Sequence, residues 1–287
     1  MSTRDSGGTR DRRAAKHERL LEVGTSDHYE DAALYDFEYA DRTDDVRWYR
    51  RLARERAGGS PILELGAGTG RITCRLAQDG HPLIALDRMQ AMLDVLSQRA
   101  AKKKFAHAIK LVRGEMVALP CEDASVGMVI VPFNGLMHLY RWEDLLTCFR
   151  EARRVLQPGG VLAFDVELPD LEWLMWDPVE RHAITRFVHP TSGAKLVYST
   201  NHTYDLQTQV CHVRIYYDDA PKAGQPFAPP KTPRKLVHLA HRQIFPEEIR
   251  NLVAQAGLTL ESLTGDFLGI SLRRGIQSQV VVCVRPD

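Results

Sequence analysis

A run of alternating glycines directly after a short apolar segment constrains this chain more than any other feature. Residues 61–65 read P-I-L-E-L, and a segment with helical apolar spacing begins at Ile72. Between them stand Gly66, Gly68 and Gly70. This order predicts a buried strand, a tight turn and a helix. Because alternating glycines expose bare N–H groups at the positive end of the helix, we expect the turn to bind a ligand.

The spacing of the glycines excludes one common nucleotide site. A nicotinamide-binding turn needs the pattern G-x-G-x-x-G. The last position falls on Arg71 when counted from Gly66, and on Thr73 when counted from Gly68. A glycine turn in an ordinary βα unit, with no ligand, is the alternative that this motif alone leaves open.

The order E-L-G-A-G-T-G resembles motif I, E/D-x-G-x-G-x-G, of the class I S-adenosylmethionine-dependent methyltransferases. The resemblance implies an α/β fold, a Rossmann-like doubly wound seven-stranded sheet with six parallel strands and one antiparallel strand. It also implies that the cofactor is S-adenosyl-L-methionine, with the glycine loop against its methionyl part. The cofactor residues assigned here are Glu64, Gly66, Ala67, Gly68 and Gly70.

A second apolar run, L-I-A-L, ends in Asp87, about 20 residues after the glycines. An acid at the carboxyl end of the second strand can accept both ribose hydroxyls of a nucleoside. Asp87 matches the family's motif II position, and Arg88 and Met89 follow it where the family lays side chains along the adenine. Met89 also continues a helical apolar stripe, so packing in the core is its alternative role.

The segment 109–113 predicts a third strand, and Gly114-Glu115-Met116 follows it. This tripeptide resembles the family's G-D-M. The resemblance implies that Glu115 accepts a hydrogen bond from the adenine amino group and that the N–H of Met116 meets the ring. Glutamate replaces the commoner aspartate and adds one methylene.

The predicted strand 126–131 runs into P-F-N-G-L-M-H-L, at the edge where a doubly wound sheet places reacting groups. Pro132 and Phe133 are assigned to the cofactor. Enzymes that methylate exocyclic amines of nucleic acids carry N/D/S-P-P-Y/F here, and this chain lacks that tetrapeptide. The loop resembles the small-molecule pattern that ends in x-H-L. His138 is a candidate general base because imidazole titrates near neutral pH, and a backbone hydrogen bond is its alternative role.

An aromatic segment over residues 28–56 precedes the first core strand, and a helix is predicted from Asp44 or Asp45 to Arg56. In related small-molecule N-methyltransferases a tyrosine from this region approaches the transferred methyl group. The tripeptide L-Y-D is the best local match, so Tyr35 is the second catalytic candidate. Simple packing is the alternative for it.

Beyond Asp165 the alternation of strand and helix stops. β-branched and aromatic runs separated by turn signals predict an antiparallel β lid inserted after strand five. The runs span 185–188, 194–203, 208–217 and 234–245. Polar residues at strand ends and in this insertion are candidates for binding the substrate: Asp165, Tyr204, Arg214 and Arg242.

The expected domain organisation follows from these segments. Residues 1–26 are polar with mixed charge and predict a disordered tail. The cofactor-binding core takes 27–166, including an N-terminal cap helix, and the inserted region takes 167–245. Residues 246–287 complete the core with a helix and two strands.

Composition narrows the class of partner. Lys+Arg number 38 against Asp+Glu 37, so the basic surface of a dedicated nucleic-acid binder is not expected. No apolar run approaches the roughly 18 residues of a membrane span, and a cytoplasmic protein is expected. The five cysteines are scattered, and a three-residue spacing in a strand points His238 and His241 to opposite faces. No metal site is expected.

The sequence therefore predicts methyl transfer from S-adenosyl-L-methionine to a nitrogen or oxygen of a small molecule, by in-line displacement. One alternative is a tRNA or rRNA methyltransferase, and another is a non-catalytic protein that binds the cofactor. The expected partner is a small-molecule substrate, without membrane or nucleic acid, and a homodimer through the β insertion is possible.

Overall fold

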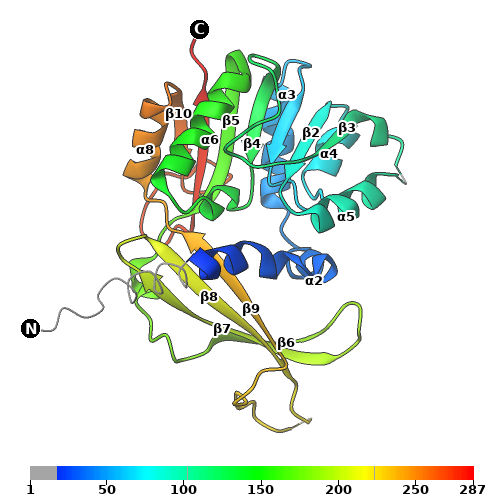
Figure 1. Cartoon of the computed structure of the whole chain (residues 1–287), viewed down its shortest axis with the longest axis vertical. Helices are drawn as coiled ribbons and strands as arrows, with labels where there is room; N and C mark the ends of the chain where they lie inside the picture. Colours follow the sequence, from blue (N-terminus) through cyan, green and yellow to red (C-terminus); the bar gives the residue numbers. More distant parts are fainter. Residues whose placement is uncertain (1–17, 102, 223) are drawn as a thin grey trace, which may run out of the picture. The chain divides into compact units, whose positions relative to one another are not determined.

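The computed structural model describes residues 18–101, 103–222 and 224–287. The chain forms two compact units (Figure 1). The larger unit contains residues 35–170 and 242–287, and the smaller contains residues up to 34 together with 171–241. No helix in the described ranges is both long and apolar enough to cross a membrane.

The larger unit is built on a seven-stranded sheet. Its strands are β1 (Ile62–Leu65), β2 (Leu83–Asp87), β3 (Ile109–Arg113), β4 (Val126–Val131), β5 (Leu156–Glu167), β10 (Thr259–Thr264) and β11 (Ser278–Val284). Their order is β10-β11-β5-β4-β1-β2-β3, and β11 alone runs antiparallel to its neighbours in this sheet. The predicted doubly wound fold, with six parallel strands and one antiparallel strand, is confirmed. The chain order reverses between β1 and β4, the place where such sheets bind ligands.

Helices cover both faces of this sheet. The helices of the larger unit are α2 (Ala32–Glu38, which begins in the smaller unit), α3 (Asp44–Arg56), α4 (Thr73–Gln78), α5 (Gln90–Ala101), α6 (Trp142–Val155) and α8 (Pro246–Gln255), with short 3-10 turns η2 (Ala106–Ala108) and η3 (Gly135–His138). Leu63 and Val129 share an apolar core with residues of α6 and α8, whereas Ile62 and Met128 share one with residues of α3 and α4. Since successive strand residues point to opposite faces, both faces are buried and the central strands read as unbroken apolar runs.

Strand β5 begins earlier than its sequence indicates. Its sequence L-Q-P-G-G-V-L predicts a turn at P-G-G and a strand that starts at Val161. In the structure β5 begins at Leu156, and the register against β4 shifts between the pairs Val126–Leu156 and Met128–Val161. Gly159 has a φ of 73°, so the glycine pair forms an irregularity within the strand.

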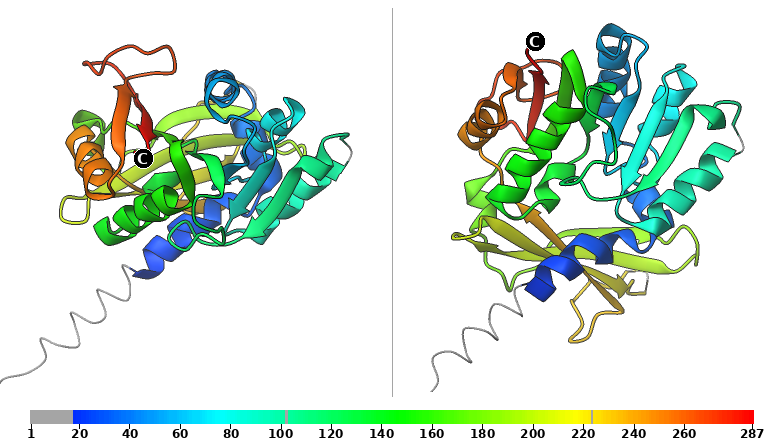
Figure 2. Two further views of the ribbon diagram at one scale, coloured as in Figure 1. Left: turned by 90° about the horizontal axis from the view of Figure 1, so that it is seen from above. Right: turned by 45° about the horizontal axis from the view of Figure 1, so that its top comes forward.

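The smaller unit contains the predicted antiparallel insertion. Its strands are β6 (His182–Val188), β7 (Lys195–Asp205), β8 (Val210–Asp219) and β9 (Lys235–Arg242), preceded by the short helix α7 (Leu171–Leu174). They form one sheet in the order β6-β7-β8-β9, and Figure 2 shows the four strands side by side. Leu196, Ile215, Tyr217 and Val237 form its apolar core, together with Leu34.

Residues 18–26 were predicted to be part of a disordered tail, but they are helical in the structure. Residues 1–17 lie outside the described part of the chain. The helix packs against β9, since a Cβ on Gly24 would lie 2.6 Å from Cβ of Ala240. In the turn η1 (Asp27–Tyr29), the Asp27 carboxylate accepts a hydrogen bond from the His238 N–H at 2.8 Å. The helix contacts β9 through Gly24, which has no side chain, so the pattern of apolar residues could not indicate this contact.

We expect Gly24→Val to destabilise the protein by about 1–3 kcal/mol, because a larger side chain overlaps the backbone of β9. Valine has the higher helix propensity, so in a solvated helix the same change would be neutral or slightly stabilising. Urea unfolding measures the difference. Glu22→Val, on the exposed side of the same helix, is the matched control. Equal effects of the two changes would contradict the packing described here.

Candidate active site

The loop between β1 and α4 forms one wall of a cavity in the larger unit. Gly66, Gly68 and Gly70 have φ values of 71°, 55° and 83°, in the left-handed region that favours glycine. A Cβ on Gly70 would lie 2.1 Å from Cδ1 of Leu96, so packing against α5 also requires glycine there. A Cβ on Gly68 would meet no atom within 4 Å, so the loop is open at this residue.

The cavity brings together residues from three separate parts of the larger unit. Seven of the predicted site residues line it: Tyr35, Glu64, Gly66, Ala67, Gly68, Pro132 and Phe133. Thr69, Arg71 and Ile72 also line it and were given no role in the sequence analysis. All three stand within or directly after the glycine motif, and this position in the sequence could have indicated that they line the cavity.

Asp87 ends β2 and holds the glycine loop. Its Oδ2 accepts a hydrogen bond from the Gly68 N–H at 2.8 Å, and its Oδ1 accepts one from the Met89 N–H at 2.8 Å. Burial raises the pKa of Asp87, although the two N–H donors oppose this shift. Each carboxylate oxygen can accept a further hydrogen bond, so Asp87 can also accept from hydroxyl groups of a ligand.

The other residues predicted near the adenine follow the ends of β2 and β3. Arg88 and Glu115 form an ion pair at 3.7 Å, and both side chains are about half exposed. The terminal methyl of Met116 lies 3.0 Å from where a Cβ of Gly66 would stand. Met116 is thus beside the glycine loop through its side chain.

Two aromatic residues that line the cavity, Tyr35 and Phe133, belong to an aromatic cluster with Tyr39. The Phe133 ring lies 4.7 Å from the Tyr39 ring and 6.4 Å from the Tyr35 ring, and the two tyrosine rings are 4.8 Å apart. The Arg42 guanidinium lies 4.5 Å from the centroid of Phe133, a cation–π contact. Burial raises the pKa of Tyr35, so its phenol stays neutral at physiological pH.

The loop that carries Phe133 has strained backbone. Phe133 and Asn134 have φ values of 54° and 63°, which non-glycine residues seldom adopt. Asp165 supports this conformation: its Oδ1 accepts hydrogen bonds from the Phe133 N–H at 2.9 Å and from the Tyr49 hydroxyl at 2.8 Å. Asn134 is fixed by Glu167, whose N–H donates to Oδ1 of Asn134 at 2.9 Å. The carboxyl end of β5 therefore shapes the loop after β4.

Burial also governs the charge of Asp165, whose side chain is almost fully enclosed. It raises the pKa of Asp165 to about 6, and the two hydrogen bonds oppose the shift. These bonds give the carboxylate a supporting role, and its predicted contact with substrate stays a prediction.

Arg71 and Asp45 form a bidentate ion pair behind the cavity. Nη1 and Nη2 of Arg71 donate to the two oxygens of Asp45 at 2.8 and 2.6 Å. Asp45 has no exposed surface. Burial opposes ionisation, but the Arg71 guanidinium lowers the pKa of Asp45 below its ordinary value. Asp45 therefore stays ionised and fixes Arg71, which lines the cavity.

The remaining predicted site residues lie elsewhere. His138 is the half-buried last residue of η3 and is not among the residues that line the cavity. Arg242 is buried, pairs with Glu248 and donates to the Tyr140 carbonyl at 3.3 Å. Tyr204 and Arg214 belong to the smaller unit, where Nε of Arg214 donates to Oδ1 of Asn201 at 2.7 Å. The described residues contain no cluster of three or more His, Cys, Asp or Glu that could hold a metal.

Comparison with known proteins gives the class of this domain. Residues 62–160 match the family model described as a methyltransferase domain. An uncharacterized methyltransferase of Mycobacterium bovis is 38% identical over 106 residues, which cover 37% of this chain and 39% of that protein. The chain therefore spans about two fifths of the length of this curated relative.

Two solved structures resemble nearly the whole chain in fold. The CcbJ methyltransferase of Streptomyces caelestis has a TM-score of 0.72 at 22% identity and covers 90% of this chain and 98% of its own. An amino pentose methyltransferase of Micromonospora echinaspora, solved with bound S-adenosylmethionine, has a TM-score of 0.59 at 18% identity and covers 88% and 96%. Residues 62–160 therefore match a methyltransferase domain, and the chain has the fold of S-adenosylmethionine-dependent methyltransferases, as the glycine motif predicted.

Glu64 provides a prediction on pH. Burial raises its pKa to about 8, although the Thr73 hydroxyl donates to its Oε2 at 2.6 Å. In an unfolded chain the pKa of a glutamate is about 4.3, so the folded state binds the proton more tightly. The stability that Glu64 contributes is thus present at low pH and is lost as the pH rises through about 8.

We expect the free energy of unfolding of Glu64→Gln to fall less between pH 6 and pH 9 than that of the wild type, because glutamine cannot ionise. Urea unfolding at both pH values measures this. Glu143→Gln, an exposed change on α6, controls for the loss of a carboxylate. Parallel slopes for Glu64→Gln and the wild type would contradict the raised pKa.

Proposed function

We propose that this protein transfers a methyl group from S-adenosyl-L-methionine to a nitrogen or oxygen atom of a small molecule. The observation that carries the proposal is a single cavity lined both by the open glycine loop and by Tyr35 and Phe133. The carboxylate of Asp87 is bonded to the backbone of that loop. Cofactor and acceptor would meet in this cavity.

The residues present fit this cofactor. Gly68 leaves open space where any other residue would place a Cβ, and its backbone lies at the cavity. Asp87 retains acceptor capacity for the ribose hydroxyls. Met89 and Met116 offer apolar side chains for the adenine, with Glu115 nearby in sequence. When bound, the cofactor supplies a methyl group attached to a sulfonium sulfur. The sulfur is an excellent leaving group, because it departs as a neutral thioether.

The protein therefore mainly has to align the acceptor, exclude water and accept a proton. Tyr35 and Phe133 exclude water through their aromatic contacts, and Tyr35 orients the acceptor at the methyl group. His138 is proposed as the proton acceptor, because the ordinary pKa range of imidazole includes neutral pH.

The amino pentose methyltransferase of the same fold supports a small amine or hydroxyl compound as the acceptor. A tRNA or rRNA substrate and a purely cofactor-binding protein are the rival proposals. Cytoplasmic location, a homodimer through the insertion and a substrate role for Tyr204, Arg214 and Arg242 stay predictions.

We expect Asp87→Ala to weaken the binding of S-adenosylmethionine and of S-adenosylhomocysteine at least tenfold, about 1.4 kcal/mol. The reason is the loss of both the loop anchor and the ribose acceptor. Calorimetric titration of the purified protein measures both affinities. Asp94→Ala, an exposed change on α5, is the control and should bind as the wild type does. If the wild type binds neither compound, the proposed function is wrong.

We expect His138→Ala and Tyr35→Phe to lower the rate of methyl transfer at least tenfold while cofactor affinity stays within about twofold, a loss of about 1.4 kcal/mol of transition-state stabilisation. The assay follows labelled methyl transfer to a panel of amines, amino sugars and hydroxyl compounds, with transfer RNA as a separate arm. His107→Ala, in the exposed turn η2, is the matched control. Full turnover of either variant would remove that residue from the mechanism.

A further inference from the structure

A second and larger pocket lies on the other side of the glycine loop. It has a volume of about 460 Å³ and is bordered by the start of α3, by α4 and by the end of α5. All its lining residues belong to the larger unit. Gly70 and Arg71 border this pocket, so it adjoins the loop that the proposed cofactor would contact. A volume of this size is typical of small-molecule sites.

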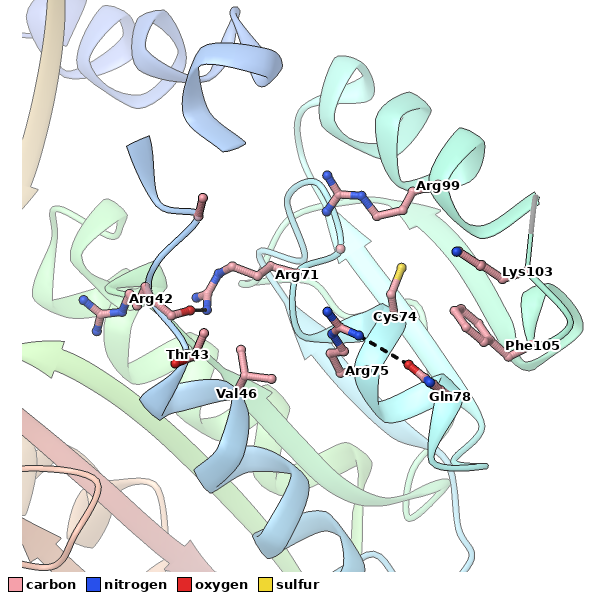
Figure 3. Close-up of a pocket in the computed structure, with 12 residues that line it drawn as sticks. Arg42, Thr43, Val46, Arg71, Cys74, Arg75, Gln78, Arg99, Lys103 and Phe105 are labelled. Carbon is pink, nitrogen blue, oxygen red and sulfur yellow. Dashed lines mark hydrogen bonds between the residues drawn. The ribbon is translucent and has the colours of Figure 1, made fainter. Parts of the chain in front are cut away.

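The walls of this pocket carry a concentration of positive charge (Figure 3). Among the residues that the structure describes, no carboxylate lines it and five cationic side chains do: Arg42, Arg71, Arg75, Arg99 and Lys103. The whole chain has a formal net charge of only +1, so composition does not account for this cluster. Burial raises the pKa of the Cys74 thiol, while the positive charges of Arg99, Arg75 and Lys103 act in the opposite direction. Cys74 and these three cations all line the pocket.

The nearby carboxylates do not balance the cations. Arg71 pairs with Asp45, and Arg42 is shared between Asp45 and Asp165 at 3.2 and 3.5 Å. Arg99 pairs with Asp36. Three of the five cations thus pair with three carboxylates, and two cations remain.

Arg75 and Lys103 carry the excess. Within residues 18–101, 103–222 and 224–287, neither side chain has a carboxylate partner within 4.0 Å. Arg75 donates a hydrogen bond to Oε1 of Gln78 at 3.5 Å. Both side chains are exposed, so a ligand can reach them. Two positive charges are in excess, which matches the charge of a phosphate monoester dianion.

The pocket also has an apolar wall. Val46 and Phe105 line it together with Cys74, and Phe105 comes from the segment that follows α5 (Figure 3). A free phosphate ion would contact only the cations and leave this wall unused. A phosphate group on an organic body would use both, because the planar guanidinium forks bind phosphate oxygens and the apolar side chains pack on the organic part.

We propose that this pocket binds a small phosphorylated organic molecule, with Arg75 and Lys103 holding the phosphate dianion and Phe105 packing against the organic part. The site is separate from the cofactor cavity and does not depend on the proposed methyl transfer.

Calorimetric titration with phenyl phosphate at pH 8 and low salt tests the proposal, because a phosphate monoester is a dianion at that pH. The titration is done with and without saturating S-adenosylhomocysteine. We expect one molecule bound per chain in both conditions, with phenyl sulfate, a monoanion of similar shape, at least fivefold weaker. Loss of binding in the presence of S-adenosylhomocysteine would place the ligand in the cofactor cavity and overturn the proposal.

The double variant Arg75→Gln/Lys103→Gln should bind phenyl phosphate at least tenfold more weakly. The control Arg54→Gln/Lys104→Gln removes the same charge from exposed positions near these elements and should stay within twofold of the wild type. If both double variants lose the same affinity for phenyl phosphate, general electrostatic attraction explains the binding and the proposed site is wrong. Inorganic phosphate binding as tightly as phenyl phosphate would overturn the organic part of the proposal.

Discussion

The buried ion pair between Asp45 and Arg71 holds the site together. An enclosed carboxylate is stable only with a partner that neutralises it, because an unpaired charge away from water costs several kcal/mol. Arg71 follows the glycine loop directly, so this pair fixes the loop against α3. The same guanidinium lies 5.3 Å from the centroid of the Phe133 ring. The Arg71 side chain thus connects the glycine loop with Phe133, and both line the cavity.

Arg71 also borders both pockets of the larger unit. A second connection runs through Asp36, which pairs with Arg99 and accepts a hydrogen bond from the Thr69 hydroxyl at 2.6 Å. Thr69 is part of the glycine loop. The glycine loop therefore contacts side chains of both pockets.

Particular elements show how far sequence reasoning reaches. The bounds of β2 and β4 follow from the sequence because strands buried on both faces read as apolar runs with clear ends. The helix over 18–26 could not be predicted, since its contact with β9 is made by Gly24, a residue without a side chain. The end of its strand makes Asp165 a substrate candidate in the sequence, and the structure adds that its carboxylate accepts hydrogen bonds from Tyr49 and from the backbone of Phe133. Those partners are distant in sequence, and no local pattern indicates them.

By itself, the sequence determined the class of the domain, the doubly wound sheet, the position of the glycine loop and the acid at the end of β2. These features depend on local rules: glycine permits left-handed backbone, and apolar periodicity decides which faces are buried. Only the tertiary structure decided which charges meet. In the structure Arg71 pairs with Asp45, and Arg99 pairs with Asp36. Arg75 and Lys103 line a pocket and have no carboxylate partner among the described residues. Charge pairing depends on distances between side chains that are far apart in the chain, and folding alone sets those distances.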